Sequence, residues 1–308
     1  MNRNKNRFFL HILLLVFASS LQFSVYAQVV SETAVVGKPK GFQELKLDSK
    51  LMKREMPYRV ILPVGYEVNA GEKFPVVYLL HGLTGHYNDW TDKTKIVEYA
   101  KNYDYIIVMP EGDNGWYSDS ATIENDKYES YIMQELVPEI EKKFRANTNR
   151  ESRAIAGLSM GGYGSLKFGL KYPEKFVLVG SFSGALRAAE WTAKEIGNSG
   201  WKVLVDSIMN TYGAADSDTR KQNDIFKLLQ AKPADDAKKL PFFYLDCGTE
   251  DMLVLQARDF NLKLAEMKIP HEYRELPGIH NWNFWNAEVL EFLQVSERFI
   301  RSAKAKSN

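Results

Sequence analysis

The chain has 308 residues, of which 45% are hydrophobic, and a formal net charge of +1 at pH 7. This content is ample for a large buried core. The lysines and arginines are scattered and no basic run with interleaved aromatic residues occurs, which argues against nucleic acid as a partner. The acid-rich loop over residues 111–119 lacks the spacing of a calcium loop, so we expect neither a metal nor another cofactor.

The first residues predict a secretory signal peptide. Three basic residues precede an apolar run over residues 8–18, and a small-residue cleavage pattern ends at Ala27. The alternative is a membrane anchor, but the run is far shorter than the roughly 20 residues that span a bilayer. We therefore expect cleavage of residues 1–27, secretion or release to the periplasm, and a mature domain over residues 28–308 without a stable membrane anchor.

The mature chain opens with alternating patterns and continues with short apolar runs. Two segments at its start alternate as in an antiparallel pair of strands, at residues 42–47 and 58–63. Continuous apolar runs follow at residues 74–80, 105–109, 153–157, 176–181 and 241–245. Such runs are typical of strands that are buried on both faces.

Helical spacing separates these runs, most clearly over residues 128–144 and 285–300. Strands that alternate with helices predict an α/β fold: a mostly parallel sheet with helices on both faces and ligands at the carboxyl ends of the strands. Residues 187–239 form a long stretch without an obvious strand. We interpret it as a helical cap inserted between two core strands; the alternative is a plain helical connection.

The segment Gly157-Leu158-Ser159-Met160-Gly161 has the pattern of a nucleophile elbow. An elbow places a serine on a sharp turn between a strand and a helix, and the turn needs neighbours without side chains. An apolar run precedes the segment and further glycines follow it, as that geometry requires. The pattern therefore predicts Ser159 as a nucleophile.

A serine nucleophile needs a histidine base and an orienting acid. The expected order of serine, acid and histidine leaves His271 and His280 as candidates for the base. His271 opens an alternating run that is typical of a strand, whereas His280 follows Pro277-Gly278 in a loop before the C-terminal helix. His280 is therefore the favoured base.

Two aspartates are candidates for the acid. Asp246 closes the apolar run at residues 241–245, whereas Asp251 lies in the loop that follows. The position in a loop favours Asp251, while a carboxylate at a strand end commonly accepts backbone N–H bonds, which is the alternative role for Asp246.

An oxyanion needs preorganised donors, and loss of one donor costs about 10²- to 10³-fold in rate. The glycine-rich turn His81-Gly82-Leu83-Thr84-Gly85 follows the run at residues 74–80. We expect the backbone amides of Leu83 and Met160, the residue after the nucleophile, to form the oxyanion hole.

Taken together, these motifs resemble the esterase D branch of the alpha/beta-hydrolase superfamily. The matching stretches span nearly the whole mature chain: residues 79–85 with Asp89-Trp90, residues 111–119, 156–164 and 246–251, and His280-Asn281-Trp282. The resemblance implies Ser159 as nucleophile, Asp251 as acid, His280 as base, and Leu83 and Met160 as the oxyanion hole. One departure is Ile279-His280-Asn281, where relatives often have Gly-His-Asp; Ile279 is expected to crowd or to line the pocket.

Aromatic residues near these motifs are candidates for substrate binding. Trp116 and Tyr117 follow the run at residues 105–109, and Trp282 stands beside His280. Packing of the loop is the alternative role for each of them.

The resulting prediction is a secreted serine carboxylesterase that hydrolyses short or aromatic acyl esters through an acyl-enzyme. The substrates suggested by export and resemblance are acetyl or feruloyl groups on plant cell-wall glycans. The alternatives are a general tributyrin-type esterase, a thioesterase similar to S-formylglutathione hydrolase, a secreted acyltransferase, and a non-catalytic glycan-binding module. The sequence leaves the oligomeric state open.

Overall fold

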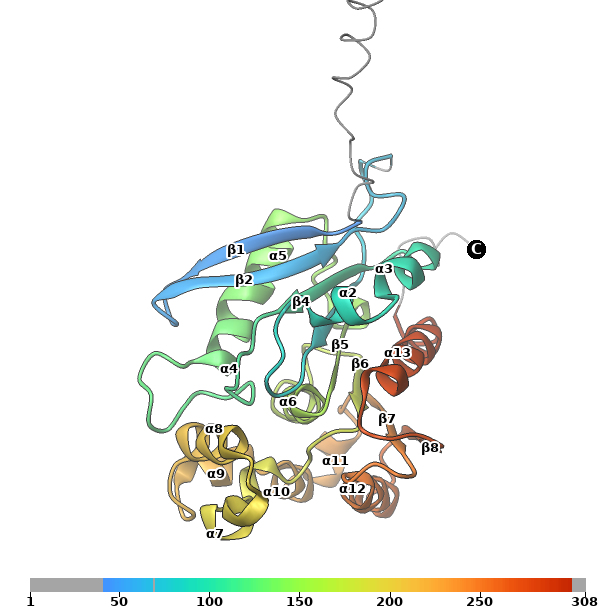
Figure 1. The fold of residues 1–308 in the computed structure, drawn as a ribbon. Helices are drawn as coiled ribbons and strands as arrows, with labels where there is room; N and C mark the ends of the chain where they lie inside the picture. The colour runs from blue at the N-terminus through green and yellow to red at the C-terminus, as the bar shows by residue number, and fades with distance from the viewer. Residues whose placement is uncertain (1–40, 69, 301–308) are drawn as a thin grey trace, which may run out of the picture. The chain divides into compact units, whose positions relative to one another are not determined.

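The computed structural model describes residues 41–68 and 70–300, so the predicted signal peptide at residues 1–27 lies outside the described residues. Eight strands form its sheet (Figure 1). The strands are β1 (Gln43–Ser49), β2 (Arg54–Ile61), β3 (Val76–Leu80), β4 (Ile106–Pro110), β5 (Arg153–Leu158), β6 (Leu178–Phe182), β7 (Phe242–Gly248) and β8 (His271–Leu276).

The order of the strands in the sheet is β1-β2-β4-β3-β5-β6-β7-β8. The pairings of β2 with β1 and with β4 are antiparallel, and the other five pairings are parallel. The mostly parallel α/β sheet predicted from the alternation of strands and helices is therefore confirmed. In this arrangement β3, β5, β6 and β7 end at the same edge of the sheet.

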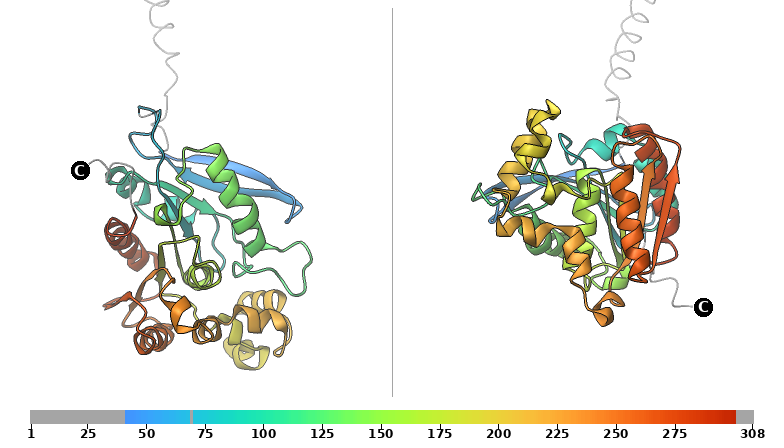
Figure 2. Two further views of the ribbon diagram at one scale, coloured as in Figure 1. Left: turned by 180° about the vertical axis from the view of Figure 1, so that it is seen from behind. Right: turned by 90° about the horizontal axis from the view of Figure 1, so that it is seen from below.

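Helices cover both faces of the sheet (Figures 1 and 2). Helices α5 (Val137–Lys143), α6 (Met160–Lys171) and α12 (Val254–Glu266) share one hydrophobic cluster with the sheet. Helices α2 (Asp89–Lys93), α3 (Ile96–Tyr99) and α13 (Trp282–Ser296) share the cluster on the other face. The remaining α-helices are α4 (Tyr128–Ser130), α7 (Ala193–Ile196), α8 (Lys202–Tyr212), α9 (Asp218–Asn223), α10 (Ile225–Gln230) and α11 (Ala234–Ala237).

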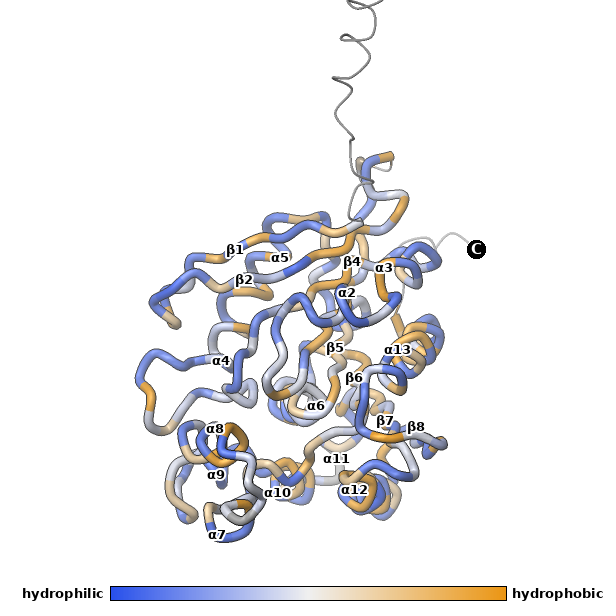
Figure 3. Tube along the Cα trace, in the orientation of Figure 1, coloured by the Kyte–Doolittle hydropathy of each residue, from blue (hydrophilic) through white to orange (hydrophobic). Residues whose placement is uncertain are grey.

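Burial on both faces explains why the central strands are continuously apolar. Every residue of β3, β4, β5 and β6 is buried, whereas β1 keeps exposed and half-buried residues along its length. Figure 3 shows the same contrast, with hydrophobic colour along the central strands and more hydrophilic colour along β1 and β2. Strands that have no solvent face need no polar alternation.

The predicted helix over residues 128–144 is present, with an irregular centre. Helix α4 continues into a π-helical segment, Tyr131–Leu136, and then into α5. Pro138 lies in the first turn of α5. A proline inside a helix offers no N–H and collides with the carbonyl four residues earlier, and a wider π turn relieves that collision.

The stretch over residues 187–239 is helical and lies between β6 and β7, as α7 to α11. The loop after β4 holds it to the rest of the fold by hydrogen bonds of 2.7 to 3.0 Å. These bonds run from Trp116 Nε1 to Ser207 Oγ, from the Ala121 amide to the Thr211 carbonyl, and from the hydroxyls of Ser120 and Thr122 to the Asn210 carbonyl. The C-terminal half of helix α8 is thus fixed to this loop.

Arg220 organises the inside of this insertion. Its side chain is buried, with 4% of the residue exposed. The guanidinium donates to backbone carbonyls of two neighbouring segments, at distances of 2.7 to 3.0 Å. The acceptors are Ala189, Trp191, Gly213 and Ala214. The guanidinium has five donors in a planar fork and can therefore serve several carbonyls at once.

We expect Arg220→Ala to lower the free energy of unfolding by roughly 2–4 kcal/mol, because the buried carbonyls lose their donors. Urea unfolding followed by circular dichroism measures the change. Arg258→Ala is the matched control, since Arg258 pairs with Glu275 at the surface and such pairs contribute less than about 1 kcal/mol. Equal losses in both variants would contradict a special role for Arg220.

Candidate active site

Ser159 lies on the turn between β5 and α6, with φ of 53° and ψ of −113°. A residue with a side chain holds this conformation only at a cost of about 1–3 kcal/mol, which the surroundings must offset. Hydrogen bonds on both sides fix the turn: the Ser159 amide donates to the Phe182 carbonyl at 2.9 Å, and the Ala185 amide donates to the Ser159 carbonyl at 3.1 Å. The strained elbow is therefore tied to the end of β6.

Two glycines permit the close packing around Ser159. A Cβ at Gly161 would lie 2.5 Å from the Leu80 carbonyl oxygen and 2.7 Å from that of His81. A Cβ at Gly82 would lie 2.6 Å from a Leu158 methyl group and 3.4 Å from the Ser159 Cβ. The atoms nearest to Gly161 belong to the backbone and cannot move away as a side chain could. The approach of α6 to the end of β3 is therefore too close for any residue other than glycine at position 161.

His280 joins the predicted nucleophile to the predicted acid. Its Nε2 lies 3.0 Å from Ser159 Oγ, and its Nδ1 lies 2.8 Å from Asp251 Oδ2. The loop after β8 carries His280 to this position, and Asn281 begins α13 by accepting the Phe284 amide. The edge of the imidazole meets Trp285, with ring centroids 4.9 Å apart. These contacts hold the ring in the orientation that links Ser159 and Asp251.

Asp251 follows β7, and its side chain is fully buried. Burial acts to raise the pKa of this carboxyl, but the hydrogen bond and charge of His280, together with the Leu253 amide, hold the pKa below its ordinary value. The carboxylate is therefore ionised at neutral pH. A buried anion at Nδ1 fixes the tautomer of His280 and leaves Nε2 free to accept a proton.

The two alternatives to these residues lie elsewhere. His271, on the edge strand β8, bonds the Ile269 carbonyl and Asn261, both on its own side of the sheet. Asp246 lies inside the sheet, opposite Phe182 on β6 and Arg274 on β8. Complete burial and the nearby Glu288 raise the pKa of Asp246 well above its ordinary value.

The loop after β3 faces Ser159. Leu83 lines the same cleft as Ser159, and Met160 is the first residue of α6, where amides lack an intrahelical acceptor. Below the loop, His81 Nδ1 donates to the Gly82 carbonyl at 2.8 Å. This bond fixes the peptide that precedes Leu83.

Glu111 supports this loop from the end of β4. Its Oε1 lies 3.2 Å from His81 Nε2 and accepts the Asp113 amide at 2.6 Å, while its Oε2 lies 3.2 Å from His86 Nδ1. Burial acts to raise the pKa of Glu111, but the hydrogen bond and charge of His81, the Asp113 amide and the charge of His86 lower it to about 2. The contact between Glu111 and His81 could not be predicted from the sequence. It forms because β3 and β4 are neighbours in the sheet.

A cleft of about 320 Å³ opens above Ser159 and His280. Three tryptophans contribute to its walls: Trp282 and Trp285 from α13, and Trp201 from the insertion. Of these three, only Trp282 is predicted from the sequence to bind substrate. The sequence feature that points to Trp201 is its position in the stretch interpreted as a cap.

Trp116 and Tyr117 are not brought to this cleft. Both are buried, with 1% and 0% of their surface exposed. Trp116 Nε1 donates to Ser207 on α8, and the Tyr117 hydroxyl donates to the His81 carbonyl. Both residues have a positive φ, 51° and 52°, and both side chains belong to the core cluster. The prediction that these two residues bind substrate is therefore wrong. Trp116 holds the insertion, and Tyr117 holds the loop after β3.

Comparisons with known proteins find relatives of this chain among esterases. The family model described as "Putative esterase" matches residues 49–294. An acetyl esterase of Caldicellulosiruptor saccharolyticus is 31% identical over 81% of this chain and 95% of its own length. FphF, a fluorophosphonate-binding serine hydrolase of Staphylococcus aureus, has a solved structure with a TM-score of 0.73 and 25% identity over 83% of this chain and 97% of its own.

A solved ferulic acid esterase is similar in structure as well. It has a TM-score of 0.71 and 26% identity, over 84% of this chain and 98% of its own. The chain belongs to the Putative esterase family. It is an enzyme that acts on ester bonds, in the esterase branch of the alpha/beta hydrolases.

The segment Ile279-His280-Asn281 differs from the Gly-His-Asp that relatives often have, but this difference does not block the cleft. Ile279 is 49% exposed and is not part of the lining of the cleft. Asn281 takes the N-cap position of α13, where its side-chain oxygen accepts the Phe284 amide at 3.1 Å. An aspartate or an asparagine is equally suited to that position.

Within residues 41–68 and 70–300, no group of three or more histidine, cysteine, aspartate or glutamate side chains is arranged to hold a metal ion. Across the same part of the chain, none of the helices combines the length and the apolar character that crossing a membrane requires.

The pKa of Glu111 predicts a pH-dependent stability. Its folded pKa of about 2 lies below the unfolded value of 4.5, so it stabilises the fold above pH 4.5, and this contribution is lost as the pH falls toward 2. The contribution is at most about 3 kcal/mol. We expect Glu111→Gln to reduce stability at pH 7 and to flatten the loss of stability between pH 5 and pH 3.

Urea unfolding at pH 7, 5 and 3 measures this effect. Glu266→Gln is the control, because Glu266 forms an exposed pair with Lys263 and such pairs contribute little. A Glu111→Gln protein whose stability falls with pH as steeply as that of the wild type would contradict the assignment.

Proposed function

We propose that the protein is an exported serine carboxylesterase that hydrolyses acetyl or feruloyl esters on plant cell-wall glycans. The observation that carries the catalytic part is the chain of two hydrogen bonds from Ser159 through His280 to Asp251. The leader sequence over residues 1–27 supports export. The acetyl esterase and ferulic acid esterase among the similar proteins support the class of acyl group.

In the first half of the reaction, Ser159 Oγ attacks the ester carbonyl and its proton passes to His280 Nε2. The carbonyl oxygen becomes an oxyanion, to which the amides of Leu83 and Met160 donate. The bond to the alcohol then breaks, and His280 gives its proton to the leaving oxygen. The products of this half are the free alcohol and an acyl group on Ser159.

The second half repeats these steps with water. His280 takes a proton from a water molecule, whose oxygen attacks the acyl carbonyl, and Ser159 leaves with that proton. Asp251 stays ionised throughout and stabilises the imidazolium that forms twice in each cycle. Its lowered pKa is what this role requires.

The cleft supports the choice of acyl group. Trp201, Trp282 and Trp285 surround Ser159 and His280, and their faces and edges suit an aromatic acyl group or the apolar face of a sugar. The volume of about 320 Å³ is adequate for an acetyl or feruloyl ester and small for a long fatty chain.

We expect Ser159→Ala and His280→Ala to reduce kcat/KM for 4-nitrophenyl acetate by at least about 10⁴-fold. Asp251→Asn should cost about 10³- to 10⁴-fold, since the tautomer of His280 is no longer fixed. Initial rates of 4-nitrophenol release measure each change.

Two variants serve as matched controls. Asp246→Asn should cost less than about tenfold, because Asp246 lies inside the sheet and His280 bonds to Asp251 instead. His271→Ala should keep most of the activity, because its partners lie on its own edge of the sheet. Loss of activity in His271→Ala with a normal circular dichroism spectrum would overturn the assignment of the base.

A panel of substrates tests the proposed acyl class. We expect the mature protein to show a higher kcat/KM on acetylated xylan or methyl ferulate than on tributyrin or S-formylglutathione, measured by release of acid at equal enzyme concentration. A preference for S-formylglutathione would reject the glycan ester while leaving the catalytic assignment intact.

A further inference from the structure

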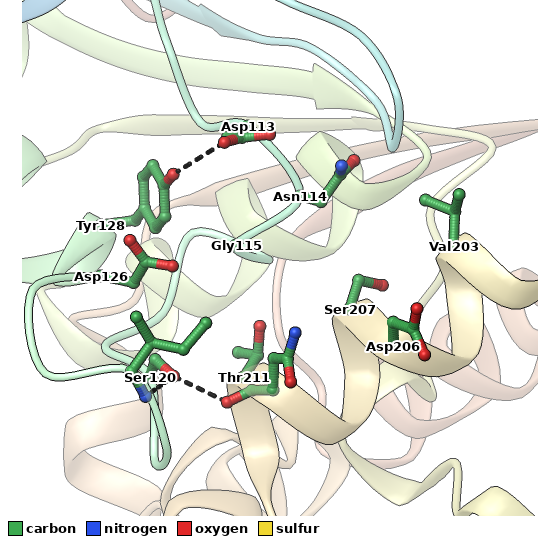
Figure 4. Close-up of a pocket in the computed structure, with 12 residues that line it drawn as sticks. Asp113, Asn114, Gly115, Ser120, Asp126, Tyr128, Val203, Asp206, Ser207 and Thr211 are labelled. Carbon is green, nitrogen blue, oxygen red and sulfur yellow. Dashed lines mark hydrogen bonds between the residues drawn. The ribbon is translucent and has the colours of Figure 1, made fainter.

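A second pocket, here named the outer pocket, lies between the loop over residues 113–128 and helix α8 of the insertion. Its volume is about 300 Å³. Figure 4 shows its two walls: Asp113, Asn114 and Tyr128 from the loop side, and Val203 and Asp206 from α8. The reaction described above uses none of these side chains.

The polar groups of the outer pocket are carboxylates, amides and hydroxyl groups. Three carboxylates, Asp113, Asp126 and Asp206, and two amides, Asn114 and Asn210, contribute to its lining. None of the residues that line it is a lysine or an arginine. An anionic ligand is therefore disfavoured, whereas a neutral ligand with several hydroxyl groups finds acceptors for their protons.

The charges of two of these carboxylates are balanced outside the pocket. Asp126 pairs with Arg54, and Asp206 pairs with Lys202. The Asn210 carbonyl accepts hydrogen bonds from the loop, while its side chain stays exposed at the pocket. A neutral partner can thus bond to the free positions of these groups without the desolvation of an unpaired charge.

Apolar surface lies beside the polar groups. Ile123 is 39% exposed and Val203 is 40% exposed, one on each wall of the outer pocket. A pyranose ring offers hydroxyl groups at its rim and C–H groups on its faces. Acceptors combined with exposed aliphatic side chains fit that pattern better than they fit a purely polar solute or a purely apolar chain.

The outer pocket adjoins the cleft at Ser159. On one side, the Thr84 amide, in a residue that lines the cleft, donates to Asn114 Oδ1 in the outer pocket at 2.8 Å. On the other side, Trp201 lines the cleft and Val203, two residues later, lines the outer pocket. The outer pocket and the cleft are therefore neighbours, separated by the segments around Thr84 and Trp201.

Trp201 stands at this division with 47% of its surface exposed. An indole with a face toward solvent costs free energy unless a ligand or partner covers it. Aromatic faces stack on the C–H faces of sugar rings, so Trp201 provides a platform between the two pockets.

We propose that the outer pocket binds a neutral pyranose unit of the glycan that carries the ester, with Trp201 stacking on the unit between it and Ser159. This inference rests on the proposed function and extends it from the acyl group to the sugar chain. The Asp206 carboxylate accepts hydrogen bonds from the hydroxyl groups of that unit, and the Asn210 side-chain amide accepts and donates them.

Kinetics on two substrates test the proposal. We expect Asn210→Ala and Asp206→Ala to lower kcat/KM for acetylated xylo-oligosaccharides about tenfold, through KM, and to leave 4-nitrophenyl acetate hydrolysis within about twofold of the wild type. Asp216→Ala is the matched control, an exposed carboxylate of the same insertion outside the outer pocket. Unchanged KM values in both test variants would overturn the proposal.

Binding without turnover separates this proposal from the catalytic one. Calorimetry of Ser159→Ala protein with xylotetraose and cellotetraose, which carry no ester, should show binding of at least one of them. The double variant Ser159→Ala/Asn210→Ala should bind the same sugar about tenfold more weakly than Ser159→Ala. Absence of binding by both sugars would reject the outer pocket even in an active esterase. An inactive wild-type enzyme that still binds them would reject the proposed function and keep the outer pocket.

Discussion

The arrangement of the site depends on one close approach, that of the first turn of α6 to the end of β3. Gly161 brings the helix so near that a Cβ would lie 2.5 Å from the Leu80 carbonyl oxygen. This contact sets the positions of Ser159, at the start of the helix, and of Leu83, just beyond the strand. The nucleophile and both expected oxyanion amides are therefore fixed relative to one another before any substrate binds, which is what electrostatic preorganisation requires.

Three buried carboxyl groups near this edge of the sheet show how neighbours decide protonation. Asp251 has a histidine and a backbone amide as partners and is ionised. Glu111 has two histidines and backbone amides as partners, and its pKa is lowered to about 2. Asp246 is buried beside Glu288, and its pKa is raised well above its ordinary value, although Arg274 lies opposite. Burial is common to all three, so the donors within reach, and not depth, decide the direction of each pKa shift.

Much of the fold followed from the sequence because strands with two covered faces must be apolar throughout. The runs near β3, β4, β5, β6 and β7 carried that signal, and the order of the motifs along the chain reduced the choice of histidine to two. What the sequence did not provide were side-chain directions and contacts between distant segments. Trp116 and Tyr117 follow the expected strand, yet both side chains turn inward into the core cluster. The contact of Glu111 with His81 and the arrival of Trp201 at the cleft depend on which strands and helices become neighbours.

The inward turn of Trp116 also determines how the insertion acts. A buried indole bonded to Ser207, together with the bonds from the loop to the end of α8, holds this helix against the core. Opening α8 as a lid would expose that indole and break these bonds together, at a cost of several kcal/mol. The insertion is therefore a fixed wall beside the cleft. Under the proposed function, Trp201 at its edge and the polar groups of the outer pocket contact the sugar chain that carries the ester.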